Sequence, residues 1–327
     1  MPLSDIEGQP RAVEALRRAA LSGRLHHAFL FSGPDGVGKT LTAHALAQAL
    51  LCTSPEEGDA CGTCNACLRV ADLNHADLHV VEREGTAKQI TIKQVRALQR
   101  ALGFKAFEGA RRVVIIQEAE RMNPATANAL LKTLEEPGPD THFVLVTHGA
   151  HLLLPTIVSR CQRVRFAPLE RALVARHLCE LAGIEPVAAE LLAALAEGSI
   201  GKGLSLSKSP VLEQRAALLA FADAPRDLLR VPQLLELAED LARRPDDLPL
   251  VLHVLRTWYR DLLLVREGLS EGLVHRDLEA RLRERARSLS LEAVMTRIDL
   301  VNETEAALDR NANTRLSLET LFLQLAA

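Results

Sequence analysis

The sequence predicts an α/β fold in its first half and an all-helical second half. Between residues 29 and 166, short apolar runs alternate with helical patterns, which is the order of a parallel sheet covered by helices on both faces. Beyond Pro168 the strand pattern disappears and helical periodicity continues to the C-terminus. We therefore expect an α/β domain at 1–168, a small helical domain at 169–208 and a larger helical domain at 209–327.

The first elements lead up to a glycine-rich loop. Residues 5–25 have apolar side chains at helical spacing, and a strand is expected at 28–31. His26 and His27 come just before this strand. We expect their side chains to point apart and to pack or form hydrogen bonds rather than bind a ligand. A second helical pattern covers residues 41–51.

Between this strand and this helix lies a stretch that fits GxxxxGK[ST], the pattern of a phosphate-binding loop. Its residues are Gly33, Pro34, Asp35, Gly36, Val37, Gly38, Lys39 and Thr40. The glycines let several backbone N–H groups point at one anion, and the next helix directs its positive dipole end there. Lys39 would contact the β and γ phosphates, and Thr40 would offer its hydroxyl to Mg²⁺. The alternative is an accidental glycine-rich turn, but the strand, loop, Lys-Thr pair and helix occur in the expected order.

A group of cysteines follows the second helix. Cys52, Cys61, Cys64 and Cys67 have the spacing C-x8-C-x2-C-x2-C, within a module at about 52–75. Thiolates this close in sequence can enclose a tetrahedral Zn²⁺ ion and leave no coordination position for water. The pattern therefore predicts a structural zinc rather than a hydrolytic one. An iron–sulfur cluster and plain buried cysteines are the alternatives.

Further strand and helix patterns complete the α/β part. Apolar runs predict strands at 79–81, 113–116, 143–146 and 164–166. The second of these runs is apolar on both faces, as expected of a central parallel strand. Helices are expected at 91–102 and from Asn123, which is a suitable N-cap before Pro124, to the prolines that follow residue 136.

The composition restricts the classes of partner. The 327-residue chain is 48% hydrophobic and 25% charged, has a net charge of −3, and contains one Trp and one Tyr. This charge gives no overall attraction to nucleic acid, and so few aromatic side chains argue against a dedicated single-strand binder. No run is long enough for a membrane span, and the first residues do not form a signal peptide. We therefore expect no membrane partner and a cytoplasmic location.

Taken together, these motifs resemble the AAA+ clamp-loader subunits of bacterial DNA polymerase III. The resemblance rests on the phosphate loop, the four-cysteine insert after its helix, the segment ANALLKTLEEP at 127–137, and Ser159-Arg160-Cys161. It covers residues 5–208 strongly, whereas the rest of the chain matches in length and helical character. The resemblance implies an AAA+ domain with a parallel sheet and a zinc-binding insert, a small helical lid and a helical collar that joins subunits.

Within this family, three departures from the motor subunits gamma and tau favour the delta-prime type. Motor subunits carry a Mg²⁺-binding carboxylate where this chain has Gln117, and an amide weakens that site. Glu118, which would orient the attacking water, is retained. The segment at 198–201 lacks the arginine with which motor subunits sense the γ-phosphate. Length is the third departure, because the long motor form has further domains after the collar.

The resemblance therefore implies a delta-prime subunit that binds ATP or ADP and has weak or absent ATPase activity of its own. It counts as a DNA polymerase only by membership of the polymerase III holoenzyme. Expected partners are the gamma/tau and delta subunits and, through the complex, the sliding clamp and primed DNA. The alternatives are an ATP-hydrolysing motor, of the gamma/tau type or another AAA+ DNA motor, and a zinc-stabilised scaffold with an inactive nucleotide site.

The resemblance also gives two side chains a role. Arg160 matches the arginine finger that is supplied to the ATP of a neighbouring subunit, where charge develops in the transition state. The alternative for Arg160 is a structural arginine paired with a carboxylate. Thr147, at a predicted strand end, resembles the first sensor position, although a threonine there is as often a helix cap.

Overall fold

The chain folds as two compact units, Met1–Glu170 and Arg171–Ala327. The structure is a computed structural model, and it describes residues 1–85, 87, 89–108, 111–222 and 231–326. The division between the units lies close to the end of the α/β domain expected at 168. The further division near residue 208 stays a prediction, and parts of the domain expected at 209–327 lie outside the described residues.

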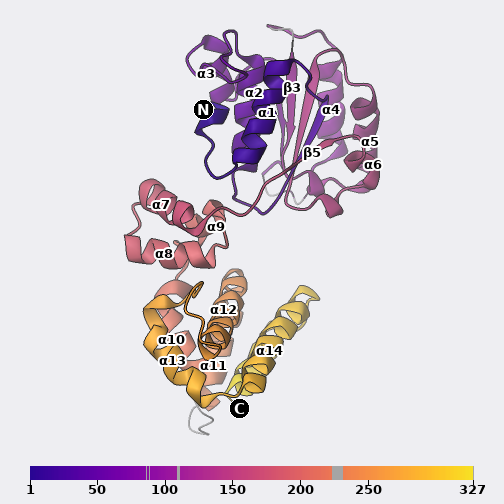
Figure 1. Cartoon of the computed structure of the whole chain (residues 1–327). Coiled ribbons are helices and arrows are strands. Elements are labelled where there is room, and N and C mark those ends of the chain that lie inside the picture. The colour runs from indigo at the N-terminus through magenta and orange to yellow at the C-terminus, as the bar shows by residue number, and fades with distance from the viewer. Residues whose placement is uncertain (86, 88, 109–110, 223–230, 327) are drawn as a thin grey trace. The chain divides into compact units, whose positions relative to one another are not determined.

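The first unit is a parallel sheet between two layers of helices (Figure 1). Its strands are β1 (Ala28–Ser32), β2 (Leu78–Val81), β3 (Arg112–Ile116), β4 (Thr141–Thr147) and β5 (Gln162–Arg165). Its helices are α1 (Pro10–Ser22), α2 (Lys39–Leu51), α3 (Asn65–Ala71), α4 (Ile92–Leu102), α5 (Pro124–Glu135) and α6 (Pro155–Val158), with short 3-10 helices at η1 (Leu3–Asp5), η2 (Ala119–Arg121) and η3 (Ala150–Leu152). The five strands pair in parallel in the order β2-β3-β4-β1-β5. The predicted α/β fold class is therefore confirmed.

Local sequence signals set the ends of several helices. Gly23 ends α1 in the left-handed conformation with φ 66°, which glycine adopts without strain. Thr91 and Gln94 form a capping box at the start of α4. At the start of α5, the Asn123 side chain accepts a hydrogen bond from the Thr126 N–H at 2.9 Å. The helices predicted at 91–102 and from Asn123 therefore begin where the sequence predicts, whereas the helix predicted over 5–25 begins only at Pro10.

The sheet is buried on both faces. Every residue of β3 and β4 is buried, and helices α1, α2 and α3 lie on one face while α4, α5 and α6 lie on the other (Figure 1). The order of the strands brings the carboxyl ends of β3, β4 and β1 side by side. In open α/β sheets, ligands bind outside the carboxyl ends of the strands. Polar side chains at the ends of these three strands are therefore the candidates for a binding site.

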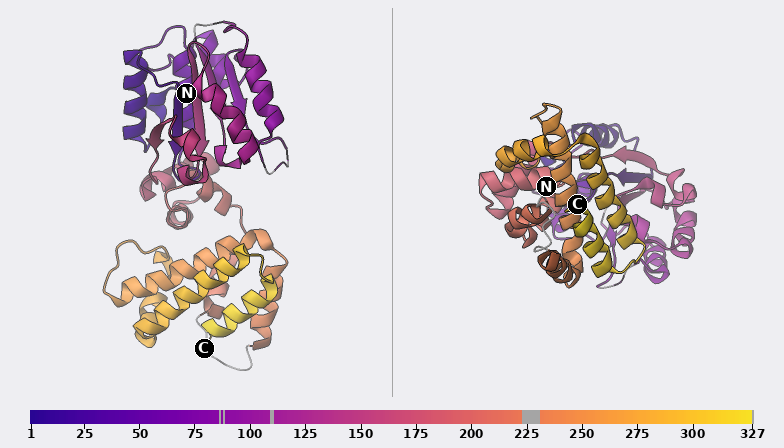
Figure 2. Two further views of the ribbon diagram at one scale, coloured as in Figure 1. Left: turned by 90° about the vertical axis from the view of Figure 1, so that its right-hand side faces the viewer. Right: turned by 90° about the horizontal axis from the view of Figure 1, so that it is seen from below.

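The second unit is helical throughout the residues that the structure describes. Its helices are α7 (Arg171–Ala182), α8 (Pro186–Leu195), α9 (Ile200–Leu206), α10 (Val211–Ala222), α11 (Val231–Ala242), α12 (Leu248–Arg266), α13 (Glu279–Ser288), α14 (Leu291–Asp309) and α15 (Thr314–Leu325), with 3-10 turns at η5 (Pro245–Asp247) and η6 (Arg276–Leu278). The last two helices, α14 and α15, pack against α12 and α11 respectively (Figure 2). Among the described helices, we find none with the length and apolar character that crossing a membrane requires.

A buried polar cluster fixes the core of the second unit around α12. Trp258 is fully buried, and its ring meets that of His275 edge-on at 5.6 Å between centroids. His275 has no exposed surface, and its Nδ1 accepts a hydrogen bond from Arg215 at 2.8 Å. Its Nε2 lies 3.0 Å from the Thr257 hydroxyl. Burial, followed by the charge of Arg215, lowers the pKa of His275 to about 3, so the ring is neutral at pH 7.

Candidate functional site

The phosphate loop joins β1 to α2 at the carboxyl edge of the sheet. A Cβ atom on Gly33 would lie 2.3 Å from the backbone oxygen of Phe166, so the close approach of these two segments requires glycine. Gly38 is the N-cap of α2 and has φ 96°, a conformation that other residues rarely adopt. Because α2 begins at Lys39, inside the loop, its free N–H groups and positive dipole end are where an anion would bind.

Lys39 is held within this loop by contacts to the residues just before it. Its Nζ donates hydrogen bonds to the backbone oxygens of Gly33 at 2.7 Å and Pro34 at 2.5 Å, and lies 3.4 Å from Asp35 Oδ1. The residue is 5% exposed, and this burial lowers its pKa, while the charges of Asp35 and Glu120 act in the opposite direction. A buried ammonium group among carbonyl oxygens is suited to a stronger acceptor such as a phosphate oxygen.

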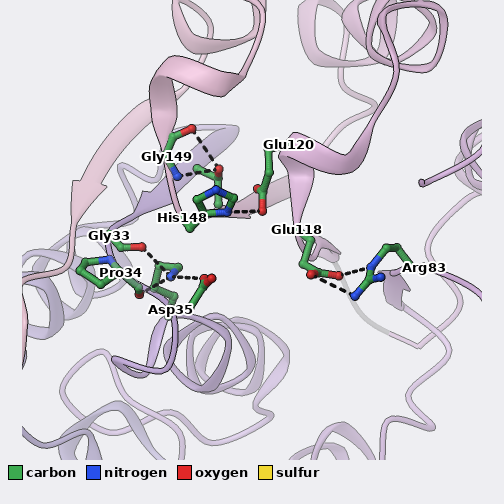
Figure 3. A network of polar contacts seen from close by, with 10 residues as sticks. Gly33, Pro34, Asp35, Arg83, Glu118, Glu120, His148 and Gly149 are labelled. Carbon is green, nitrogen blue, oxygen red and sulfur yellow. Dashed lines mark hydrogen bonds and ion pairs between the residues drawn. The ribbon is translucent and has the colours of Figure 1, made fainter. Parts of the chain in front are cut away.

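Neither of the two residues that follow β3, Gln117 and Glu118, provides a free carboxylate. Gln117 is an amide, and its backbone N–H donates to the Val81 oxygen of β2 at 2.9 Å. Glu118 adopts a left-handed conformation with φ 45° and ψ 51°. Its carboxylate is bound by Arg83 through Nε at 2.5 Å and Nη2 at 3.2 Å (Figure 3). The sequence predicted Glu118 at this edge, but it gave no indication of Arg83, which lies 35 residues away.

A second carboxylate, Glu120, lies in η2 and faces the end of β4. Its side chain is 7% exposed, and its Oε1 lies 2.6 Å from Nδ1 of His148 (Figure 3). The other oxygen, Oε2, is buried and has no hydrogen-bond partner among the described residues. Sequence reasoning missed both Glu120 and His148. The only available signal was the acidic run that ends β3.

Thr147, the predicted sensor, is enclosed at the end of β4. It is 1% exposed, and its hydroxyl donates to the Gly149 oxygen at 3.2 Å and accepts from the Gly149 N–H at 3.1 Å. Both hydrogen-bonding capacities of the hydroxyl are thus used within the turn. The contacts of Thr147 stabilise the turn, whereas His148, the next residue, is 39% exposed.

Arg160 lies just after α6 and is 35% exposed. Its Nη1 donates to the Thr156 backbone oxygen at 2.9 Å, and its Nη2 forms an ion pair with Glu135 at the end of α5. The carboxylate pairing that the alternative interpretation of Arg160 expected is therefore present within the chain. Both side chains of this pair reach the surface.

The sulfur atoms of Cys52, Cys61, Cys64 and Cys67 converge on one point. They all lie within 4.8 Å of one another, with Cys52 3.5 Å from Cys61 and 3.8 Å from Cys64. Four sulfurs placed tetrahedrally at the Zn–S bond length of about 2.3 Å would be about 3.8 Å apart. The donor set and its spacing therefore fit Zn²⁺.

Backbone N–H groups favour thiolates in this cluster. The N–H groups of Cys61, Cys64 and Cys67 each lie 3.4 Å from the sulfur of another cluster cysteine. Burial acts to raise the pKa of Cys64, but hydrogen bonds from Thr53 and from the Cys67 N–H outweigh it and lower this pKa to about 5. Burial raises the pKa of Cys52 and Cys67. A bound cation would favour the deprotonated form of all four thiols.

The cysteine module is fastened to the rest of the first unit. Cys52 is the C-cap of α2, and Cys64 is the N-cap of α3. Gln48 of α2 donates to the Cys67 backbone oxygen at 2.8 Å. The buried Asp59 carboxylate accepts from the N–H groups of Leu3 at 2.7 Å and Ser4 at 2.8 Å. The module therefore ties the N-terminal segment to the end of α2, as a structural metal site would.

Comparisons with known proteins agree with this architecture. The family model "DNA polymerase III, delta subunit" matches residues 8–170, and "DNA polymerase III, delta subunit, C terminal" matches residues 202–327. DNA polymerase III subunit delta' of Bacillus subtilis is 31% identical, with 98% of this chain and 96% of the relative covered. The corresponding subunit of Pseudomonas aeruginosa is 36% identical, with 94% of each chain covered.

The motor-type relatives match less completely. Subunit tau of Bacillus subtilis is 26% identical over 98% of this chain, but the match covers 61% of the tau chain. The delta' relatives are more similar and are matched over nearly their whole length. The chain therefore belongs to the delta' subunit family of DNA polymerase III, the delta-prime type of the clamp loader.

Proposed function

We propose that the chain acts in the clamp loader as a nucleotide-binding subunit that hydrolyses little or no ATP at its own site. The observation that carries this proposal is the contrast between the two halves of the site. The loop from Gly33 to Thr40 is complete, whereas Gln117 is an amide and Glu118 is bound by Arg83. Backbone N–H groups and Lys39 can hold phosphates without a carboxylate, but hydrolysis needs a group that positions the attacking water.

Arg160 is the side chain that we propose acts on a neighbouring subunit. A guanidinium supplied to the γ-phosphate of a gamma/tau subunit would stabilise the charge that develops in the transition state. The partial exposure of Arg160 and its contacts to Thr156 and Glu135 support this role, because they hold the guanidinium at the surface in one orientation.

Two metal ions belong to the proposal. Zn²⁺ would be held by Cys52, Cys61, Cys64 and Cys67 and would stabilise the fold, which the spacing of the sulfur atoms supports. Mg²⁺ would accompany the nucleotide, with the Thr40 hydroxyl as its contact in the loop and with weaker binding because residue 117 is not an acid.

Membership of the delta' family supports a proposal for the partners. We propose that the helical part of the second unit joins a collar with gamma/tau and delta subunits, in the cytoplasm. Through these subunits the chain would help to open the sliding clamp and to load it on primed DNA. Its net charge of −3 supports an indirect rather than a general electrostatic contact with DNA.

Steady-state ATPase assays test this function against the motor alternative. We expect the isolated chain with primed DNA to show little turnover, and the loader reconstituted with gamma/tau and delta to need this chain for full ATPase activity and clamp loading. Robust ATPase activity of the isolated chain would contradict the proposal. An equilibrium titration with ATP tests the alternative of a scaffold with an inactive nucleotide site. If the wild-type chain binds ATP and the Lys39→Ala variant does not, this alternative is excluded.

A further inference from the structure

Gln9 joins three parts of the first unit through one side-chain amide. Its Nε2 donates to the backbone oxygens of Ala167 at 2.7 Å and Val37 at 3.3 Å, and its Oε1 accepts from the Ala167 N–H at 3.2 Å. The residue is 4% exposed. Gln9 is also the N-cap of α1, but its side chain makes no capping hydrogen bond. The amide is therefore used for contacts with distant residues, 28 and 158 positions away, rather than for the helix that it begins.

The contact with Ala167 anchors the Gln9 side chain to the sheet. Ala167 comes shortly after β5, and the N–H of the residue between them, Phe166, donates to the Ser32 oxygen of β1 at 2.8 Å. Two hydrogen bonds of opposite direction then hold the Gln9 amide on the backbone of Ala167. The third hydrogen bond of this fixed amide reaches Val37 in the phosphate loop.

Val37 lies in the part of the phosphate loop that has the fewest restraints of its own. It stands between Gly36, with φ 70°, and Gly38, with φ 96°. Because glycine has no Cβ, the backbone on either side of Val37 can adopt many conformations. Among the described residues, the Gln9 amide is the one donor to the Val37 oxygen. This hydrogen bond therefore holds the Val37 carbonyl group in one direction.

The direction of this carbonyl group determines the direction of the Gly38 N–H. A peptide unit is planar and trans, so the Val37 C=O and the Gly38 N–H point to opposite sides of the chain. With the Val37 oxygen turned toward Gln9, the Gly38 N–H points away from it and precedes the free N–H groups at the start of α2. The Gly38 N–H has no acceptor within the described part of the chain. A phosphate oxygen would be a suitable acceptor for it.

We propose that Gln9 is a positioning residue of the nucleotide site, which acts through Val37 to direct the Gly38 N–H toward the phosphates before a nucleotide binds. This inference rests on the proposed nucleotide binding. A loop whose donors are aligned in advance loses less conformational freedom on binding. Without the Gln9 amide, the peptide unit between Val37 and Gly38 would populate other orientations, and part of the binding free energy would be needed to align it.

The test is the ADP affinity of Gln9→Met, measured by isothermal titration of the full chain with Mg²⁺. Methionine is similar in length to glutamine but has no donor for the Val37 oxygen. A hydrogen bond between uncharged groups corresponds to roughly fivefold in an equilibrium constant, so we expect roughly fivefold weaker binding. Gln99→Met is the matched control, because the Gln99 amide also donates to a backbone oxygen, that of Ala129 at 2.8 Å, but joins α4 to α5. This control should keep the wild-type affinity.

Nuclear magnetic resonance of the chain labelled with ¹⁵N-glycine separates positioning from a loss of stability. At saturating ADP, the Gly38 amide proton of the wild type should move downfield, because it donates to an anion, and Gln9→Met should reduce this shift. If Gln9→Met does not fold, Gln9→Asn should give both results, since its amide is one methylene group too short to reach Val37 and Ala167 together.

Three results would overturn this inference and leave the proposed function standing. They are wild-type ADP affinity in a folded Gln9 variant, an unchanged Gly38 shift in that variant, and an equal loss of affinity in Gln99→Met. Failure of the wild-type chain to bind ADP would overturn both the inference and the proposed function.

Discussion

Arg160 and Glu135 form an ion pair that joins the segment after α6 to the end of α5. The guanidinium is 35% exposed and the carboxylate 48% exposed, so the pair itself adds little stability. Together with the hydrogen bond from Arg160 to the Thr156 oxygen, the ion pair fixes the direction of the long Arg160 side chain. A guanidinium that is already oriented loses less conformational freedom when it meets a phosphate.

Arg160→Ala should impair the reaction of a neighbouring subunit and not the folding of this one. Loss of an arginine finger costs on the order of 10³-fold in the rate of the site it serves. We expect reconstituted loaders with Arg160→Ala to assemble normally by size-exclusion chromatography and to lose ATPase activity in single-turnover assays. Normal clamp loading by this variant would refute the assignment.

Glu135→Gln should lower the same rate by a smaller factor. Because a partly exposed ion pair is worth up to about 1 kcal/mol, we expect a decrease of up to about fivefold in kcat, with KM nearly unchanged. In the Arg160→Ala background the substitution should have no further effect. Glu136→Gln changes the exposed neighbouring carboxylate and serves as the control. If it lowered kcat as much as Glu135→Gln does, Glu135 would not act through Arg160.

Gln117→Asp tests whether the missing acid limits hydrolysis. An anionic ligand at the end of β3 should hold Mg²⁺ more firmly, and we expect the ATPase rate of the isolated chain to rise, with Gln117→Ala showing no increase. Adding Arg83→Ala should raise the rate further, since it releases Glu118. If Gln117→Asp leaves the rate at the wild-type level, Gln117 is not the limiting defect.

Removal of the metal should destabilise the first unit. We expect elemental analysis to find about one zinc per chain, and Cys61→Ser or a strong chelator to lower the midpoint of thermal unfolding, because metal-binding free energy contributes to folding. Cys179→Ser changes a cysteine outside the cluster and is the control. An unchanged unfolding curve after complete zinc removal would contradict a structural role.

Acid should unfold the second unit through His275. Its pKa is about 3 in the folded chain and near 6.5 when unfolded, so stability present above pH 6.5 is lost as the pH falls toward 3. At pH 5 the loss is about 2 kcal/mol. The fluorescence of Trp258, the single tryptophan of the chain, reports the unfolding of the second unit in urea titrations. His275→Gln should be less stable at pH 7 but less sensitive to pH, and an unchanged pH slope would exclude His275 as the cause.

Apolar periodicity was sufficient to predict the sheet and four helices of the first unit, α1, α2, α4 and α5, whereas the second unit was predicted only as helical. The run Val113–Ile116 is apolar at each position, and such a run can only be buried on both faces, as it is in β3. The cysteine cluster was equally predictable, because ligands close in sequence need little tertiary information to converge. Both are local signals, carried by residues within a few turns of each other.

Contacts between distant segments were not predictable. Arg83 reaches Glu118 because Glu118 adopts a left-handed turn that no residue preference demands. His148 reaches Glu120 because β4 lies beside β3 in the sheet, which the order in the sequence does not specify.

The expectation that His26 and His27 point apart was wrong. Their rings stack with centroids 4.3 Å apart. The chain bends at His27, just before β1, and Nδ1 of His26 lies 2.8 Å from the oxygen and 3.1 Å from the nitrogen of Ala28. This short turn places the two neighbouring rings on the same side of the chain.

Helix α2 starts at Lys39 in the phosphate loop and is capped at its other end by Cys52 of the metal cluster. Its 13 residues form a rod of about 20 Å between the two. The N-terminal N–H groups of the phosphate loop and one sulfur of the cysteine cluster therefore belong to a single rigid element, so the position of either end constrains that of the other.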